Sequence, residues 1–288
     1  MTSPIPRPKK SLGQNFLVDP NYIRKIISAA EIIPNETVLE IGPGHGVLTR
    51  ALAEKAGRVI AIELDRELLK ILQEKLADLK NLKLIQADAM TFDYQQLDGP
   101  VKVVANLPYN IAIPLIFRLM EIRKKLTYMV LMLQKEVGQR IVAKPGGKDY
   151  GVLSVTLQYY TEPRLMFTVP RTCFVPRPRV DSAIIKLKVL PEPRWPVRDE
   201  GWFLQVLRAG FSHRRKFLSN ALMDAGFSPQ IVRYAFHHAG MDPKRRAETL
   251  SPPEFCMLAD QLYVGARAET QTERSSDAPT PRARTGKA

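Results

Sequence analysis

The segment Asn106-Leu107-Pro108-Tyr109 carries the most specific chemistry in this sequence. It directly follows the apolar run Val101–Ala105, so it stands where a buried strand is expected to end. The Asn106 side-chain oxygen and the Leu107 carbonyl could accept both hydrogens of an exocyclic amine, which shifts electron density onto its nitrogen. Pro108 keeps Leu107 out of the helical region, and Tyr109 can stack on an extruded base. The segment predicts catalysis at the N6 amine of adenine, with an Asx-Pro turn as the plainer alternative.

A glycine-rich turn earlier in the chain predicts the second substrate. Gly42, Gly44 and Gly46 follow the β-rich run Thr37–Ile41 and precede a helical pattern. Glycines at such a switch from strand to helix let a nucleotide-like ligand approach the backbone closely. The dinucleotide fingerprint needs its third glycine at position 47, which is Val47. The spacing therefore disfavours a nicotinamide or flavin and favours S-adenosylmethionine, whereas a tight turn without any ligand is the bland reading.

Two carboxylates stand at the ends of the next two β-rich runs. Glu63 ends the run Arg58–Glu63, where a carboxylate can accept both hydrogens of a ribose diol. Asp88 follows the run Leu82–Ala87 and can accept from a cofactor adenine amino group. Asp65 competes with Glu63, but its position suits the N-cap of the following helix better. Because the carboxyl ends of parallel strands meet at one edge of a sheet, we expect these groups to share one site.

The elements that must position these residues alternate along the first two thirds of the chain. Helical patterns run from the cap Asp19-Pro20 to about Glu31 and over Asp65–Leu79. Seven β-rich runs are predicted as strands: Thr37–Ile41, Arg58–Glu63, Leu82–Ala87, Val101–Ala105, Thr127–Gln134, Leu153–Tyr160 and Ala183–Val189. The alternation predicts an α/β fold, a doubly wound, mainly parallel, seven-stranded Rossmann-like sheet with an antiparallel edge.

The composition divides the chain into five parts. Residues 1–10 are basic and Pro-rich and are predicted to be mobile, and residues 11–190 form the catalytic domain. Residues 191–196 read as a linker, residues 197–265 as a small all-helical domain, and residues 266–288 as a disordered tail without large apolar residues. Within the helical domain the patterns cover Gly201–Ala225, Pro229–Ala239 and Pro252–Tyr263.

Cysteine, histidine and hydropathy patterns exclude several classes of protein. Cys173 and Cys256 have no redox or metal-type spacing and are expected to be packed thiols. The four histidines have no metal-ligand company, so we predict no metal site. No apolar run is long enough to span a bilayer and no signal core follows the basic N-terminus. We expect a cytoplasmic protein, a monomer without a membrane partner.

The charge predicts a polyanionic partner. Lys and Arg number 43 against 29 Asp and Glu, which gives a formal net charge of +14. Neutralising phosphates releases counterions and drives association with nucleic acid. The clusters Arg214-Arg215-Lys216 and Arg245-Arg246 are the predicted RNA-binding residues, in the helical domain. A solvated helix face is the alternative reading of the first cluster.

Several motifs in this order together resemble those of the ribosomal RNA adenine dimethyltransferases. The resemblance covers roughly residues 8–262 and lies in Lys10–Leu17, Glu40–Gly46, Asn106–Tyr109, Phe174–Ser182 (the run Phe-Val-Pro-Arg-Pro-Arg-Val-Asp-Ser), Phe211–Asn220 and Arg246–Ser251. The last two segments resemble the small-subunit branch of that family rather than the large-subunit methylases that confer antibiotic resistance.

The resemblance implies an S-adenosylmethionine-dependent enzyme that dimethylates two adjacent adenosines in the 3′-terminal hairpin of 16S rRNA. It implies the small ribosomal subunit, or a late precursor of it, as partner, and four S-adenosylmethionine consumed per rRNA. It also implies cofactor binding by the positions of Asn15, Leu17, Gly42, Glu63, Asp88 and Asn106, to which the glycine-rich turn adds Gly44. In the family the position of Phe174 flanks the target base opposite Tyr109.

Three other functions remain open at this point. The chain could be a large-subunit rRNA adenine methylase, or a DNA adenine methylase that shares the Asn-Pro-aromatic logic. It could also be a ribosome-assembly factor whose binding matters more than its methylation. The intact Asn106–Tyr109 segment argues against lost catalysis.

Overall fold

The computed structural model describes residues 8–9 and 12–276, with the side chains of residues 270–276 excepted. By their contacts the described residues form two compact units. The first comprises the chain up to Ala143 together with Leu157–Arg194, and the second comprises Lys144–Thr156 and the chain from Trp195 onward. The division at Arg194 falls inside segment 191–196. The inclusion of residues 144–156 in the second unit differs from the boundaries expected from sequence.

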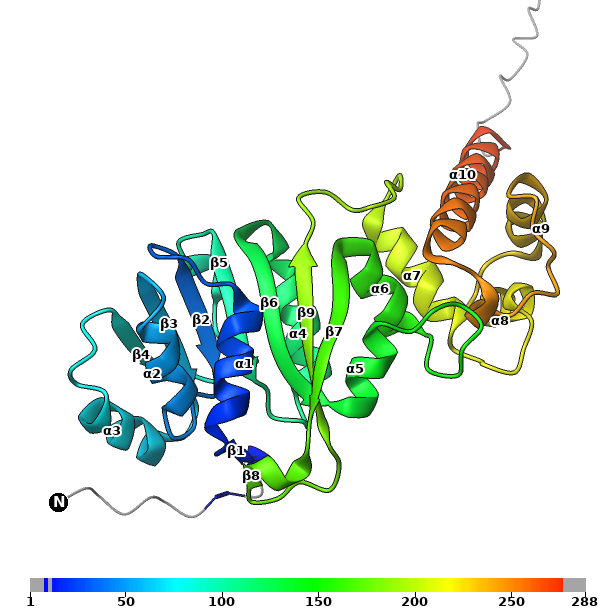
Figure 1. Cartoon of the computed structure of the whole chain (residues 1–288). Helices are drawn as coiled ribbons and strands as arrows, with labels where there is room; N and C mark the ends of the chain where they lie inside the picture. Colours follow the sequence, from blue (N-terminus) through cyan, green and yellow to red (C-terminus); the bar gives the residue numbers. More distant parts are fainter. Residues whose placement is uncertain (1–7, 10–11, 277–288) are drawn as a thin grey trace, which may run out of the picture. The chain divides into compact units, whose positions relative to one another are not determined.

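The first unit is built on a seven-stranded sheet of order β4-β3-β2-β5-β6-β9-β7 (Figure 1). Its strands are β2 (Thr37–Ile41), β3 (Arg58–Glu63), β4 (Leu82–Gln86), β5 (Val101–Asn106), β6 (Leu126–Gln134), β7 (Thr161–Val169) and β9 (Ser182–Val189). The five strands from β4 to β6 pair in parallel, whereas β9 is antiparallel to both β6 and β7. The predicted α/β, mainly parallel seven-stranded sheet is confirmed. The antiparallel strand, however, lies second from the edge.

Helices cover both faces of this sheet, and Figure 1 shows α1 (Pro20–Ala30) in front of it and α4 (Ala112–Glu121) behind it. The remaining helices before residue 161 are α2 (Val47–Ala53), α3 (Arg66–Lys75), α5 (Lys135–Ile141) and α6 (Val152–Tyr160), of which α6 crosses the boundary between the two units. Central strands such as β5 and β6 are buried on both faces, which explains their nearly continuous apolar sequence.

Two helix starts confirm the capping predictions. Asp19 caps α1 by accepting from the Asn21 amide at 2.8 Å, and Pro20 occupies the first turn. Asp65 caps α3 by accepting from the Glu67 amide at 3.0 Å. Because a cap uses residues adjacent in sequence, it can be read without tertiary information.

The predicted strand Leu153–Tyr160 is wrong, because this run lies in helix α6. The seventh strand is the next segment, β7, which begins at Thr161. The run is buried on most sides, including Ser154 and Thr156, and periodicity cannot distinguish a buried helix from a buried strand in that case. Pro163 lies within β7, and a proline argues against a strand when only the sequence is considered. It is tolerated here because β7 is an edge strand, where a residue can do without a backbone N–H that pairs with a neighbouring strand.

The second unit is mainly helical, with α7 (Glu200–Gly210), α8 (Leu218–Asp224), α9 (Pro229–His238) and α10 (Pro252–Ser276). The predicted helix Gly201–Ala225 is wrong as a continuous element, because residues 211–217 form a turn between α7 and α8. A Cβ on Gly210 would lie 2.7 Å from Leu218 Cδ1, so the two helices approach closely at this glycine. The Leu218 amide donates to the Arg245 carbonyl at 2.7 Å, outside any helix.

The predicted disordered tail also differs from the structure over residues 266–276, which continue α10. The Ser228 hydroxyl bonds the Glu269 carboxylate at 2.7 Å, and Arg267 donates to the Tyr263 hydroxyl at 3.0 Å. Extending an existing helix by one residue costs far less free energy than nucleating a new one. Good helix formers such as Ala266 can therefore continue α10 without large apolar residues. Residues 277–288 of the predicted tail, and residues 1–7 and 10 of the predicted mobile N-terminus, lie outside the described residues.

Candidate functional site

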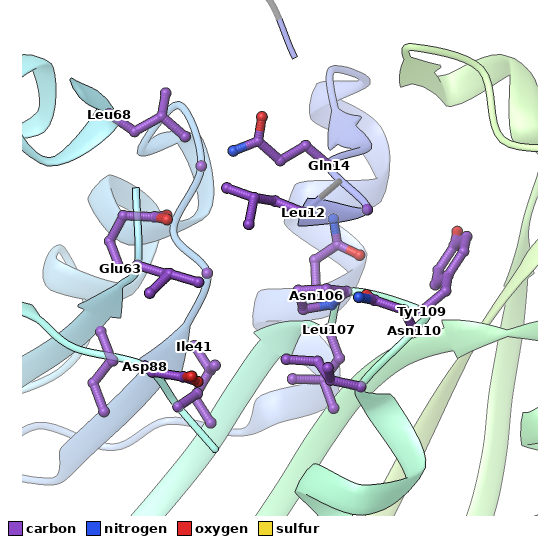
Figure 2. Close-up of a pocket in the computed structure, with 18 of the residues that line it drawn as sticks. Leu12, Gln14, Ile41, Glu63, Leu68, Asp88, Asn106, Leu107, Tyr109 and Asn110 are labelled. Atoms are coloured by element: carbon purple, nitrogen blue, oxygen red, sulfur yellow. The ribbon is translucent and has the colours of Figure 1, made fainter. Parts of the chain in front are cut away.

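The carboxyl ends of β2, β3, β4 and β5 converge on one pocket of the first unit. Figure 2 shows Glu63 and Asp88 on one side of this pocket and Asn106, Leu107 and Tyr109 on the other. The predicted residues that line it are Asn15, Gly42, Gly44, Glu63, Asp88, Asn106, Leu107, Pro108 and Tyr109. Parallel strands place residues that are distant in sequence at one edge, so the expected convergence is confirmed.

The turn between β2 and α2 adopts a backbone that requires glycine. Gly42, Gly44 and Gly46 have φ of +71°, +55° and +76°, in the left-handed region that L side chains rarely adopt. A Cβ on Gly44 would also lie 2.7 Å from Phe16 Cδ1. The turn can therefore approach a ligand in the pocket with bare backbone.

The carboxylate of Glu63 is held in place within the pocket wall. Its side chain is buried, and its Oε1 accepts from the Asp65 amide at 2.9 Å. Burial raises the pKa of Glu63, while the backbone amides of Asp65 and Gly44 oppose the rise. Asp88 is half-buried and accepts from the Met90 amide at 2.8 Å. Both carboxylates can accept hydrogen bonds from a ligand.

Asn106 is oriented by the N-terminal segment. Its amide nitrogen donates to the Asn15 carbonyl at 2.9 Å, so its side-chain oxygen points the other way. Leu107 is anchored by its amide, which donates to the Met132 carbonyl at 3.2 Å, and its own side chain is buried. The two acceptors predicted for an exocyclic amine, the Asn106 side-chain oxygen and the Leu107 carbonyl, therefore belong to residues that are held in place by hydrogen bonds.

The ring of Tyr109 is fixed by its hydroxyl, which lies 2.6 Å from the buried Ser182 Oγ. Burial raises the pKa of Tyr109, so the phenol is neutral at physiological pH. A neutral aromatic ring held by one hydrogen bond offers a stable face for stacking.

Two predicted site residues do not line this pocket. Phe174 lies in β8 (Phe174–Val175), is 2% exposed, and pairs with Leu17 of β1 (Phe16–Leu17). Leu17 lines a smaller neighbouring cavity, together with Glu40 and Asn106. The predicted stacking role of Phe174 stays a prediction, since its ring is covered in this structure.

Further residues of the site were not identified from sequence. Those that line the pocket are Leu12, Gly13, Gln14, Phe16, Ile41, Ile62, Leu64, Leu68, Ala87, Ala89, Met90, Asn110 and Ile111. Most are apolar or flank a motif, and only their adjacency to the strand ends could have indicated them. Glu40 was seen only as part of the glycine-rich motif. It is 1% exposed, burial raises its pKa to about 8, and its Oε2 has no hydrogen-bond partner among the described residues.

The basic clusters of the second unit form one surface from three segments. Arg214 donates to the Lys148 carbonyl, and the Leu218 amide donates to the Arg245 carbonyl, which brings the three segments together. The exposed cations of these segments, called the basic surface below, are Lys144, Lys148, Arg214, Arg215, Lys216, Lys244 and Arg246. Four of the five predicted RNA-binding residues belong to it, and Lys216 also pairs with Asp224 at 2.6 Å.

Arg245, the fifth, is engaged within the unit. Its guanidinium lies 2.5 Å from Glu254 Oε1 and donates to the Thr249 carbonyl at 2.6 Å. The hydrogen bond to Arg245 lowers the pKa of Glu254 from its ordinary value of 4.5 to about 2. These contacts indicate a stabilising ion pair at this position.

This ion pair gives a prediction for stability against pH. A carboxyl whose pKa is lower in the folded state stabilises the fold above pH 4.5, and this contribution is lost as the pH falls towards 2. We expect Arg245→Gln to lower Tm near pH 7, and the difference from the wild type to narrow by about pH 3. Thermal melting at several pH values measures this, and a constant difference would contradict the assignment.

The cysteines, the metal-ligating side chains and the helices offer no further site among the described residues. Cys173 and Cys256 are buried and free, as expected of packed thiols. No group of three His, Cys, Asp or Glu among the described residues could hold a metal ion. None of the described helices has the length and apolar character needed to cross a bilayer.

Comparison with known proteins adds the family context. Residues 6–263 match the family described as "Ribosomal RNA adenine dimethylase". The "Ribosomal RNA small subunit methyltransferase A" of Moorella thermoacetica is 49% identical over 266 residues, which cover 88% of this chain and 92% of that protein. The protein of the same name from Bacillus cytotoxicus is 48% identical, with 88% and 91% covered.

Two solved structures resemble most of the chain. A dimethyladenosine transferase from Plasmodium falciparum has a TM-score of 0.74 at 27% identity, covering 87% of this chain and 98% of that one. The 23S rRNA methyltransferase ErmE has a TM-score of 0.68 at 28% identity, covering 86% and 99%.

Proposed function

Because this chain belongs to the ribosomal RNA adenine dimethylase family, we propose that it dimethylates N6 of two adjacent adenosines in the 3′-terminal hairpin of 16S rRNA. S-adenosylmethionine is the methyl donor, and the small ribosomal subunit or a late precursor is the substrate. The observation that carries this proposal is the convergence of Glu63, Asp88 and the Asn106–Tyr109 segment on one pocket. The relatives named for the small subunit are nearly half identical to the chain, whereas ErmE is 28% identical.

The residues of the pocket fit an S-adenosyl ligand. Gly42 and Gly44 leave room for its close approach, Glu63 presents a carboxylate to the ribose hydroxyls, and Asp88 presents one to the adenine amino group. When bound, S-adenosylmethionine supplies a methyl group activated by its sulfonium. The protein's own task is then to position and activate the acceptor.

The acceptor is held by the opposite wall. The Tyr109 ring stacks on the flipped adenine, and the Asn106 side-chain oxygen and the Leu107 carbonyl accept the two N6 hydrogens. These bonds strengthen as the nitrogen loses its planarity, so they stabilise the transition state more than the ground state. The N6 proton leaves after the methyl group has transferred, and no strong general base is needed.

The basic surface contributes contacts to rRNA phosphates. Phosphate contacts set position and orientation but do not by themselves select two bases. We therefore propose that selection comes from docking on the folded subunit, while the unpaired loop lowers the cost of flipping each adenosine.

The test is a methyl-transfer assay on under-methylated small subunits, on the isolated hairpin with the same loop, on 23S rRNA and on duplex DNA. We expect N6,N6-dimethyladenosine in 16S rRNA, with the subunit a much better substrate than the hairpin. Mass mapping of 16S rRNA from cells that lack the gene should show both adenosines unmodified. Transfer to 23S rRNA or DNA instead would reject the proposal, and equal activity on hairpin and subunit would reject docking.

Glu63→Gln tests the ribose contact. The substitution keeps a side-chain acceptor for the Asp65 amide but removes the charge. A hydrogen bond to a charged group contributes about 1–1.5 kcal/mol more free energy than one to a neutral group, so we expect roughly tenfold weaker S-adenosylmethionine binding. Calorimetry on the folded variant measures the affinity, and an unchanged value would remove Glu63 from the cofactor site.

A further inference from the structure

The N-terminal segment bridges the two sides of the pocket. The structure describes its residues 8–9 and 12–15, called the strap below. At one end the Asn15 carbonyl accepts from Asn106, and at the other Lys9 reaches the start of α3. Between these ends Leu12 and Gln14 line the pocket, and Figure 2 shows both pointing toward the side formed by Glu63 and Leu68.

The Lys9 end of the strap contacts one buried carboxylate, that of Asp65. Lys9 Nζ lies 3.0 Å from Asp65 Oδ1 and 2.9 Å from Glu67 Oε2. Gln14 Nε2 donates to Asp65 Oδ2 at 3.3 Å, and Gln14 in turn accepts from the Lys9 amide at 2.7 Å. The side chain of Asp65 is 2% exposed, against 40% for Lys9.

Asp65 is more than a helix cap. Although burial acts to raise its pKa, the hydrogen bonds from Lys9, the Glu67 amide and Gln14 lower it, so the carboxylate is ionised. Its backbone amide donates to Glu63 Oε1, the proposed ribose acceptor. A single residue thus touches the cap of α3, the strap and the wall of the pocket.

We propose that Asp65 is a positioning residue for the S-adenosyl ligand, holding the strap across the pocket through Lys9 and Gln14 while its amide orients Glu63. This inference rests on the proposed function, because it assumes that ligand. The spent cofactor must leave before the next methyl transfer, and leaving requires the strap contacts to break. Salt screens the ion pair between the exposed Lys9 and Asp65, so a higher salt concentration should speed release of the spent cofactor.

The contacts of Asp65 with Lys9 and Gln14 are called the latch below. Asp65→Asn tests the latch separately from the helix cap. Asparagine caps helices about as well as aspartate, so α3 keeps its start. The strap loses its buried anionic partner and keeps only the exposed Glu67, 2.9 Å from Lys9. We expect S-adenosylhomocysteine to dissociate about three to ten times faster at low ionic strength, since one partner is exposed and the other buried. In the wild type the dissociation rate should rise with salt, and in the variant this dependence should be weaker, because only the Lys9–Glu67 ion pair remains.

The matched control is Asp199→Asn, the same change at the N-cap of α7 in the second unit, where Asp199 accepts from the Trp202 amide at 2.8 Å. It should leave both the dissociation rate and its salt dependence at the wild-type values. Stopped-flow dissociation of S-adenosylhomocysteine and melting of the ligand-free proteins are measured for each variant. A cap defect alone would lower the melting temperature without changing the salt dependence of release.

Lys9→Gln tests the other partner and stands by itself if Asp65→Asn does not fold. We expect it to give fast release that is insensitive to salt, because it removes the ion pairs of Lys9 to both Asp65 and Glu67. The double variant should change release by less than the sum of the two single changes, because both disrupt the Lys9–Asp65 contact. Wild-type release rates and salt dependence in Lys9→Gln overturn the latch even if the protein methylates rRNA as proposed. A wild-type protein that neither binds S-adenosylhomocysteine nor methylates rRNA overturns the proposed function, and the latch with it.

Discussion

Replacing Asn106 by alanine is expected to lower the rate of methyl transfer by about a hundredfold to a thousandfold, the usual effect of removing one preorganised group that stabilises a transition state. The Asn106 side-chain oxygen is the acceptor that becomes stronger as the adenine nitrogen turns pyramidal. The affinity for rRNA should change little, because the proposed phosphate contacts belong to the basic surface of the second unit.

Single-turnover assays at saturating S-adenosylmethionine measure this effect, since Asn106 also fixes Asn15 of the strap and its loss can weaken cofactor binding. Asn21→Ala, at the exposed start of α1, is the matched control and should retain wild-type turnover. Near-wild-type turnover of Asn106→Ala under saturating conditions would rule out activation of the amine by this residue.

Neutralising Arg214, Arg215 and Lys216 together is expected to weaken rRNA binding by up to about a hundredfold near physiological salt. Each lost phosphate contact should also reduce the slope of log affinity against log salt by up to about one unit. These cations lie in an exposed turn beside Lys148, and not on a helix face as one reading of the sequence held.

The control removes the same number of positive charges from a different surface of the protein. Neutralising Lys55, Lys80 and Lys83, which are exposed in the first unit, removes the same formal charge from another surface. Binding measured at several salt concentrations should show a nearly unchanged slope for this control. If both triple variants lose the same slope, the net charge matters and the basic surface has no special part.

The sequence by itself determined the features that depend on neighbouring residues or on the order of elements. The caps at Asp19 and Asp65 use atoms within three residues, so residue type and spacing suffice to predict them. The convergence of the glycine turn, Glu63, Asp88 and Asn106 follows from parallel strand order, because every such strand ends at the same edge.

Only the tertiary structure decided which partner a side chain finds across long separations. Arg245 pairs with Glu254, nine residues away in sequence, and Phe174 is covered where the chain folds back onto β1. Residues 153–160 are mostly buried, which removes the periodicity that distinguishes helix from strand, so their helical conformation could not be read from the sequence. Lys9 and Asp65 are 56 residues apart, and no local propensity encodes their contact. Such contacts depend on burial and approach in three dimensions, which the folded chain alone supplies.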